Sequence, residues 1–315
     1  MKKNWILATV FPLLIAPIFA QTLQQAPKAK EALQVLPRVT VTVLVDNMAG
    51  GGPLLGEWGA AFLVETDKEQ ILFDTGGGLV LLGNARALDV NLSKTKAIVI
   101  SHEHGDHTSG LDSALNASGR VDLYIHPAGF DTRYWKDGVR AEPHTLLISR
   151  QQLMQRVRNL VETKGPTNVG EGLTVTGQIP RVRDFEDTGL SQYAFLDEKL
   201  ATPDPVLDDQ AVFFRVPEGV VIVLGCGHAG LVNTMAYVSE LTGEKRIYAV
   251  IGGTHLISAS PDRLKKTVEA LREYDVQKIL LSHCTGVRAF AELANAFPGR
   301  CRWPASGSVI RFGGR

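Results

Sequence analysis

Short apolar segments alternate with polar turns and with amphipathic stretches along most of the chain. Three runs rich in β-branched residues, at Val39–Asp46, Gly59–Glu65 and Gln70–Asp74, predict consecutive strands separated by Gly- and Asp-rich turns. Further along, apolar strand patterns alternate with helical ones, an order typical of α/β folds. The clearest helix start is Ser260-Pro261, where an N-cap residue precedes proline at the first helical position.

The later strand patterns are interrupted by one long interval. Six further segments read as strands, at Lys96–Ser101, Val121–Ile125, Val220–Leu224, Arg246–Ile251, Lys278–Ser282 and Ser308–Phe312. The interval at about 129–209 holds a basic amphipathic stretch followed by an acidic, Pro-rich run. We interpret it as an insertion beside the core that forms a lid or pocket wall, with a surface excursion as the alternative.

The first twenty residues predict an export signal outside the folded domain. Lys2 and Lys3 precede an apolar run that ends in a small residue, Ala20, which is the order of a cleaved signal peptide. A membrane anchor is the alternative, but prolines break the run and it is short for a spanning helix. We therefore expect a signal peptide at 1–20, a linker at 21–37, a domain at 38–315, and a secreted or periplasmic protein that leaves the membrane after cleavage.

Composition narrows the class of partner. The chain has 315 residues, 44% of them hydrophobic, which excludes intrinsic disorder. Its 33 basic and 33 acidic side chains give a formal net charge of zero, so we expect no nucleic-acid partner. Oligomeric state is left open. Cys226 and Cys284 each lie within two residues of a histidine, and they are either neighbours of a site or small buried hydrophobic residues.

The densest chemical feature is the segment Ser101-His102-Glu103-His104-Gly105-Asp106-His107, which directly follows a predicted strand. His102 and His104 can point the same way from an extended segment, and Asp106 and His107 can converge on them one turn later. Imidazole and carboxylate ligands suit a divalent ion such as zinc, with iron or manganese also possible. Without an ion, four such groups would be costly to crowd together.

Other metal-capable residues stand at the ends of separate strand patterns. His228, His255 and His283 each follow an apolar strand and one or more small residues, and Asp74 follows the strand at 70–74. In α/β sheets, ligand sites collect at the carboxyl ends of the strands. We therefore predict that these segments meet the histidine-rich turn at one rim and form one site.

Together these motifs resemble the metallo-β-lactamase fold superfamily over roughly Val39 to Phe312. Finer features are similar to its dihydropterin-(ribofuranosyl)aminobenzene-phosphate synthase-like branch of metal-dependent hydrolases. The fold that the resemblance implies is an α/β protein, an αββα sandwich with metals at one edge between two sheets. The motifs of the branch are Asp208-Asp209-Gln210-Ala211, Gly225-Cys226-Gly227-His228, Gly252-Gly253-Thr254-His255 and His283-Cys284-Thr285-Gly286.

The resemblance also implies roles for individual residues. His102, His104 and His228 correspond to ligands of a first metal, and Asp106, His107 and His283 to ligands of a second. Asp74 corresponds to a carboxylate that orients a ligand histidine. Many members bridge two ions with a carboxylate whose place is taken here by His255, which could bind metal or donate a hydrogen bond to developing negative charge.

We therefore predict a metallo-hydrolase with one or two zinc ions and a small-molecule substrate. A divalent ion activates water near neutral pH, and Asp106 would hold or accept the proton of that water. An ester, lactone, amide or phosphoester fits this chemistry. The alternatives are an iron-dependent oxygenase of persulfides, a synthase or transferase of the pterin-related branch, and a metal-binding protein without turnover.

Overall fold

The protein is described here by a computed structural model. Contacts group the chain from 32 onward into one compact unit. The predicted signal peptide and nearly all of the predicted linker lie outside the described residues. Within the described part, no helix has both the length and the apolar character needed to cross a bilayer. The described residues are 33–187, 189–190 and 192–314.

Two seven-stranded sheets form the centre of the described region. The first has the order β17 (Val309–Gly313), β1 (Arg38–Val45), β2 (Ala61–Thr66), β3 (Gln70–Phe73), β4 (Thr95–Val99), β5 (Asp122–Ile125) and β8 (Asn159–Glu162). The second has the order β16 (Cys301–Arg302), β15 (Lys278–Leu281), β14 (Ile247–Gly252), β13 (Gly219–Leu224), β12 (Ala211–Val216), β10 (Leu173–Val175) and β9 (Thr167–Gly170). The predicted strands are thus present, with small shifts at their ends.

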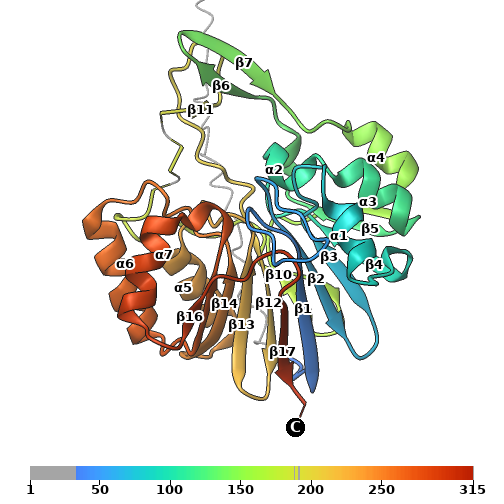
Figure 1. Cartoon of the computed structure of the whole chain (residues 1–315). Coiled ribbons are helices and arrows are strands. Elements are labelled where there is room, and N and C mark those ends of the chain that lie inside the picture. The colour runs from blue at the N-terminus through green and yellow to red at the C-terminus, as the bar shows by residue number, and fades with distance from the viewer. Residues whose placement is uncertain (1–32, 188, 191, 315) are drawn as a thin grey trace, which may run out of the picture. The chain divides into compact units, whose positions relative to one another are not determined.

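Helices cover the outer face of each sheet, and the inner faces pack against each other (Figure 1). Side-chain alternation along β2 shows why: Phe62 and Val64 lie in the core between the sheets, whereas Leu63 lies in the core under the helices. This confirms the predicted αββα sandwich. The helices over the second sheet are α5 (Leu231–Thr242), α6 (Pro261–Glu273) and α7 (Val287–Ala296), and those over the first are α1 (Leu81–Ala87), α3 (Leu111–Ser118) and α4 (Arg150–Arg156).

The predicted start of the helix at Ser260-Pro261 is confirmed. Ser260 caps α6 by accepting a hydrogen bond at Oγ from the backbone N–H of Arg263 at 3.1 Å. Leu264 and Leu271 on the inner side of this helix are buried in the core of the second sheet. The apolar spacing and the cap therefore determine this element locally.

The interval at about 129–209 requires a correction, because only part of it lies beside the core. β8, β9 and β10 come from this interval and extend the two main sheets by edge strands. The remainder forms a separate three-stranded sheet of β11 (Ala194–Phe195), β6 (Arg133–Asp137) and β7 (Arg140–His144), together with irregular segments. In Figure 1 this third sheet stands above the strand ends, which is where the predicted pocket wall would be.

Candidate metal centre

The chain brings the predicted ligands together at the rim where several strands end. His102 and His104 follow β4, and the short helix α2 (Gly105–Thr108) carries Asp106 and His107. His228 follows β13, and His283 follows β15. Two groups of potential ligand atoms result, each with all its members within 4.8 Å of one another. The first group is His102, His104 and His228, and the second is Asp106, His107, Cys226 and His283.

Asp74 is completely buried and connects the two groups. Its Oδ1 accepts a hydrogen bond from the backbone N–H of Ser101 at 2.7 Å. Its Oδ2 accepts from Ser101 Oγ and from His107 Nδ1, both at 2.7 Å. Ser101 Oγ in turn lies 2.8 Å from His102 Nδ1. One carboxylate therefore orients a histidine of each group, which is the position that the sequence predicted for Asp74.

His283 is oriented by two residues that sequence reasoning missed. Its backbone N–H donates to Asp46 Oδ1 at 3.0 Å, and its Nδ1 lies 2.9 Å from Asn47 Oδ1. The backbone N–H of Gly59 also donates to Asn47 Oδ1, while Asn47 Nδ2 donates to the His283 carbonyl. These bonds identify Oδ1 of Asn47 as the acceptor, so His283 Nδ1 must donate. The one sequence signal that could have identified Asp46 and Asn47 is that they directly follow β1, at the rim where the predicted ligands lie.

The hydrogen-bond partners of His102 and His283 leave the Nε2 lone pair of each ring facing into the cluster. Because Ser101 Oγ donates to Asp74, it accepts from His102 Nδ1, which leaves His102 Nε2 as an acceptor 2.9 Å from His104 Nδ1. By the same logic His283 Nε2 is an acceptor 3.2 Å from the Asp106 carboxylate. His283 Nε2 and the Asp106 carboxylate are therefore opposed acceptors in a largely buried place, and a cation between them removes the cost of opposing them. The donor sets therefore fit bound divalent ions, and neutral imidazole with carboxylate suits zinc, iron or manganese.

The electrostatics of the cluster also favour a bound cation. Burial, followed by the neighbouring imidazoles, holds the pKa of His102 well below its usual value. Burial also opposes protonation of His107, but Asp106 and Asp74 outweigh it and raise the pKa of His107 to about 9. The pKa of Asp106 is lowered because His107 and His283 outweigh the effect of burial. The second group therefore attracts positive charge, whereas the first keeps its imidazoles neutral.

His255 lies beside the first group and belongs to neither set of potential ligands among the described residues. Its ring centroid is 4.3 Å from that of His228, and its backbone N–H donates to Cys284 Sγ at 3.3 Å. Burial lowers the pKa of His255 to about 3, so its imidazole is neutral. It also lines the pocket next to the histidines. Of the two roles left open by the sequence, this placement favours contact with a substrate.

A buried charge network supports the histidine-rich turn from behind and was not predicted. Arg133 of β6 binds Asp204 Oδ2 through Nε at 2.6 Å and Asp208 Oδ1 through Nη2 at 2.8 Å. Asp208 Oδ2 accepts the backbone N–H of Glu103, the residue between two predicted ligands, at 2.8 Å. Glu103 also lies 3.0 Å from His144 Nε2. Burial raises the pKa of Asp208 to about 7, an effect that Arg133 opposes.

A pocket of about 440 Å³ opens onto both ligand groups. The third sheet contributes Trp135 and His144 to its wall, and the loop before β2 contributes Trp58. The ring of Trp58 lies 5.0 Å from that of His283, and its side chain remains half exposed. Apolar walls with a few convergent polar groups are typical of small-molecule sites.

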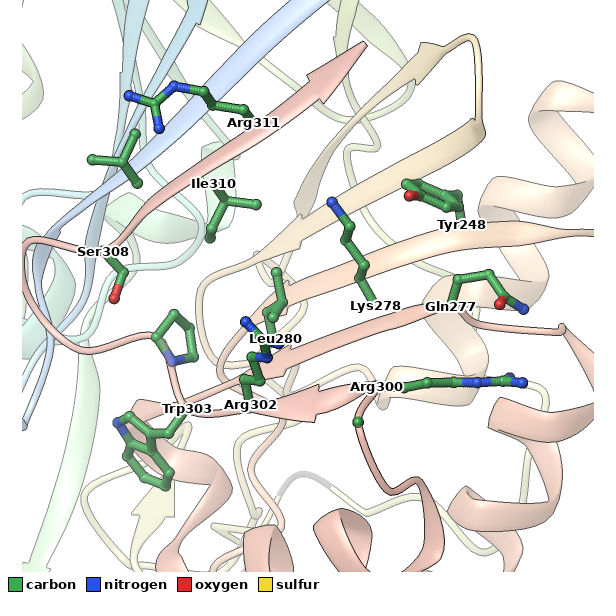
Figure 2. A pocket seen from close by; sticks show the side chains of 13 residues that line it. Tyr248, Gln277, Lys278, Leu280, Arg300, Arg302, Trp303, Ser308, Ile310 and Arg311 are labelled. Atoms are coloured by element: carbon green, nitrogen blue, oxygen red, sulfur yellow. The ribbon is translucent and has the colours of Figure 1, made fainter. Parts of the chain in front are cut away.

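A second groove, of about 580 Å³, is separate from the histidines (Figure 2). It lies along the first residues of β15 and β16 and along β17, and Lys278, Arg302 and Arg311 border it. The Lys278 ammonium sits 4.9 Å from the ring centroid of Phe312. None of the predicted metal ligands lines this groove.

Comparisons with known proteins agree with this geometry. One curated relative is the 7,8-dihydropterin-6-methyl-4-(beta-D-ribofuranosyl)-aminobenzene-5'-phosphate synthase of Methanocaldococcus jannaschii, 28% identical over 87% of this chain and 97% of that protein. The structure of Tm1679, a metal-dependent hydrolase of the beta-lactamase superfamily, is 27% identical with a TM-score of 0.71 and covers 86% of this chain and 98% of that one. The metallo-beta-lactamase fold protein YhfI of Bacillus subtilis shares the fold, with a TM-score of 0.54 and 16% identity over 87% of this chain and 99% of its own.

The sequence profile of one family spans the histidine motifs. It matches residues 59–283, which is more than half of the chain and includes every predicted ligand. The resemblance inferred from the motifs is thereby confirmed. The chain belongs to the metallo-beta-lactamase superfamily.

Proposed function

We propose that the protein is an exported metallo-hydrolase that acts on an ester, lactone, amide or phosphoester of a small molecule. The observation that carries this proposal is the pair of adjacent ligand groups, both open to one pocket. A divalent ion held there supplies Lewis acidity and makes water acidic enough to lose a proton near neutral pH. Zinc is the ion we propose, with iron or manganese as alternatives that suit the same ligands.

The protein's own residues would divide the work. His102, His104 and His228 would hold one ion, and Asp74 fixes the ring of His102 through Ser101. Asp106 is the only member of the two groups whose side chain is substantially exposed, at 19% among otherwise buried described residues. Its carboxylate therefore faces the pocket, where it can accept the proton of an attacking water.

His255 has a position suited to the substrate. It lines the pocket and is neutral, because burial lowers its pKa to about 3. A neutral imidazole can donate one hydrogen bond to an oxygen that becomes negative during the reaction. Trp58 and Trp135 would contact the apolar part of the substrate from the two sides of the pocket.

Export is the second part of the proposal. The basic start, the apolar run and the small residue at Ala20 support cleavage of a signal peptide. Expression of the full chain in a bacterial host, followed by fractionation and mass determination, tests it. We expect a periplasmic or secreted protein that lacks residues 1–20. A cytoplasmic protein of full mass would contradict export and leave the metal chemistry untouched.

A synthase is the second candidate function, and one comparison favours it. The Methanocaldococcus relative is named a synthase and matches over almost its whole length. Such an activity would use the same ligand groups to activate one substrate while a second substrate attacks. Product analysis separates the two proposals, because hydrolysis incorporates oxygen from labelled water into the product and a condensation does not.

The test of hydrolysis combines metal analysis with turnover. The purified protein is analysed for zinc, iron and manganese and is screened with ester, lactone, amide and phosphoester substrates, before and after treatment with a chelator. His102→Ala should lose both metal and turnover, because it removes a ligand of the first group. His126→Ala is the matched control, since His126 accepts the N–H of Ala128 in a turn away from the ligand groups. A protein that turns over substrate without metal would refute the proposal.

A further inference from the structure

We infer that Cys226 is a thiolate ligand of the second metal. The inference rests on the proposed metal-dependent function and adds a sulfur atom to its ligand set. Cys226 is two residues before His228 and is buried. Its sulfur is one of the four potential ligand atoms of the second group, with Asp106, His107 and His283.

Three distances within the second group, one of them to the sulfur, are compatible with ligands of a tetrahedral ion. Cys226 Sγ lies 3.1 Å from His107 Nε2, and the Asp106 carboxylate lies 3.7 Å from His107 Nε2 and 3.2 Å from His283 Nε2. Metal–sulfur and metal–nitrogen bonds of about 2.3 and 2.0–2.1 Å place tetrahedral ligands roughly 3.3–3.6 Å apart. The three measured separations lie within about half an ångström of that range.

The tautomers of the neighbouring histidines favour an ion over a thiol hydrogen bond. His107 Nδ1 donates to Asp74 and His283 Nδ1 donates to Asn47, so each Nε2 offers a lone pair to the group once its imidazole is neutral, which is the form that binds metal. A thiol at Cys226 could donate to His107 Nε2, but it would leave His283 Nε2 and the Asp106 carboxylate opposed. One divalent cation at the centre satisfies all four atoms. Its binding replaces the thiol proton, which leaves to solvent as the metal–sulfur bond forms.

The other cysteine of this region serves as an internal comparison. Cys284 is equally buried, and its Sγ accepts the N–H of His255 and donates to the carbonyl of Cys226. Its sulfur belongs to neither ligand group of the described residues. Cys226→Ser and Cys284→Ser are therefore chemically matched changes at two neighbouring thiols, only one of which is placed to hold the ion.

Cobalt(II) titration of the metal-free protein tests the inference independently of activity. The wild type should bind two equivalents and develop a sulfur-to-cobalt charge-transfer absorption in the near ultraviolet. Cys226→Ser should lose that absorption. Its affinity for the second cobalt ion should fall by at least about tenfold, because even the loss of a group that only supports a ligand costs that much. Cys284→Ser should keep both the absorption and the affinity for the second cobalt ion. Cys226→Asp should restore tight binding of the second equivalent without the charge-transfer absorption.

The possible results distinguish this inference from the proposed function. If the wild type binds no cobalt, the proposed function itself fails. If it binds two equivalents with no charge-transfer absorption, or if the absorption disappears only in Cys284→Ser, the metal site stands and the role of Cys226 is wrong.

A second measurement decides the question if Cys226→Ser fails to fold. X-ray absorption is recorded for the wild type and for Cys284→Ser, each loaded with two zinc equivalents. A sulfur neighbour at about 2.3 Å in both proteins supports Cys226, and its absence overturns it.

Discussion

Arg133→Met should destabilise the protein strongly, because it removes the cation from a buried cluster of carboxylates. Arg133, Glu103, Asp204 and Asp208 are each no more than 2% exposed. The guanidinium binds Asp204 and Asp208 directly and lies 3.4 Å from Glu103. Methionine keeps most of the apolar stem but removes the cation that binds two of the three buried carboxylates directly. The basic groups that remain are His104 and His144 near Glu103, and Arg181, which acts on Asp204 and Asp208 from further away.

The expected loss follows from the cost of an unpaired buried charge. Breaking a buried ion pair by removing one partner costs about 3–5 kcal/mol. Part of this cost is avoided because the pKa of Asp208 is already raised to about 7 by burial, so that this carboxyl takes up a proton readily. We therefore expect a loss of about 3 kcal/mol, at the lower end of the range.

Urea unfolding of the chelator-treated protein measures this loss without the contribution of bound metal. Arg38→Met is the matched control, since Arg38 pairs with Asp67 at the surface and should change the free energy of unfolding by less than about 1 kcal/mol. Adding Asp208→Asn to Arg133→Met should recover at least about 1 kcal/mol, because one of the unpaired charges is removed. If Arg133→Met is no less stable than Arg38→Met, the network does not stabilise the turn and the reasoning is wrong.

Three further predictions concern the support of the metal centre. Asp74→Asn should weaken metal binding by about 10–100-fold, because it disturbs the acceptor shared by Ser101 and His107. Competition with a chromophoric chelator measures the metal affinity, and the control Asp67→Asn should bind metal as the wild type does. Gly225→Ala should bind metal less tightly and unfold at a lower temperature, because a Cβ there would contact Ser101 Oγ and come within 2.7 Å of Asp74 Oδ2. The control Gly83→Ala adds a Cβ in open space and should keep the thermal stability of the wild type. Removing the metal should lower the free energy of unfolding by about 2.7 kcal/mol, compared with protein in the presence of free ion at 100 times its Kd. Equal unfolding curves with and without chelator would show that the folded protein does not bind the ion more tightly than the unfolded chain does.

The sequence predicted the αββα fold and the residues that meet at its rim, but not the residues that support them. The histidines were found because each follows an apolar strand pattern, and parallel strands bring their carboxyl ends to one edge. Asp46 and Asn47 obey the same rule after β1, yet nothing in their residue types distinguished them from ordinary turn residues. Local pattern pointed to the candidate ligands, whose binding of metal stays a prediction, and missed the residues that orient one of them.

The interval at about 129–209 was misjudged for a different reason. β8, β9 and β10 are only three or four residues long, and β8 and β9 have at most one buried position each, so their hydrophobic pattern is too short or too weak to recognise. What makes them strands is pairing with partners distant in sequence, such as β5 for β8 and β12 for β10. The role of Arg133 was hidden similarly, because its acids come from segments some 30 to 75 residues away in either direction. Non-local pairing of this kind has no signature in a window of sequence.

The placement of the ligands makes metal binding a measure of how the two sheets pack. His102, His104, Asp106 and His107 follow strands of the first sheet, whereas Cys226, His228 and His283 follow strands of the second. Neither sheet alone supplies a complete group, so the core between the sheets sets the distances within both groups. A shift of one sheet against the other would separate ligands that now lie within 4.8 Å, while leaving each sheet's own hydrogen bonds intact.

We therefore expect a truncation in this core, such as Phe214→Ala, to weaken metal binding at concentrations of urea too low to unfold the protein. Leu293→Ala, under the helices of the second sheet, should not weaken it. Equal effects of the two changes on metal affinity, measured at matched losses of stability, would show that the packing between the sheets does not control the site.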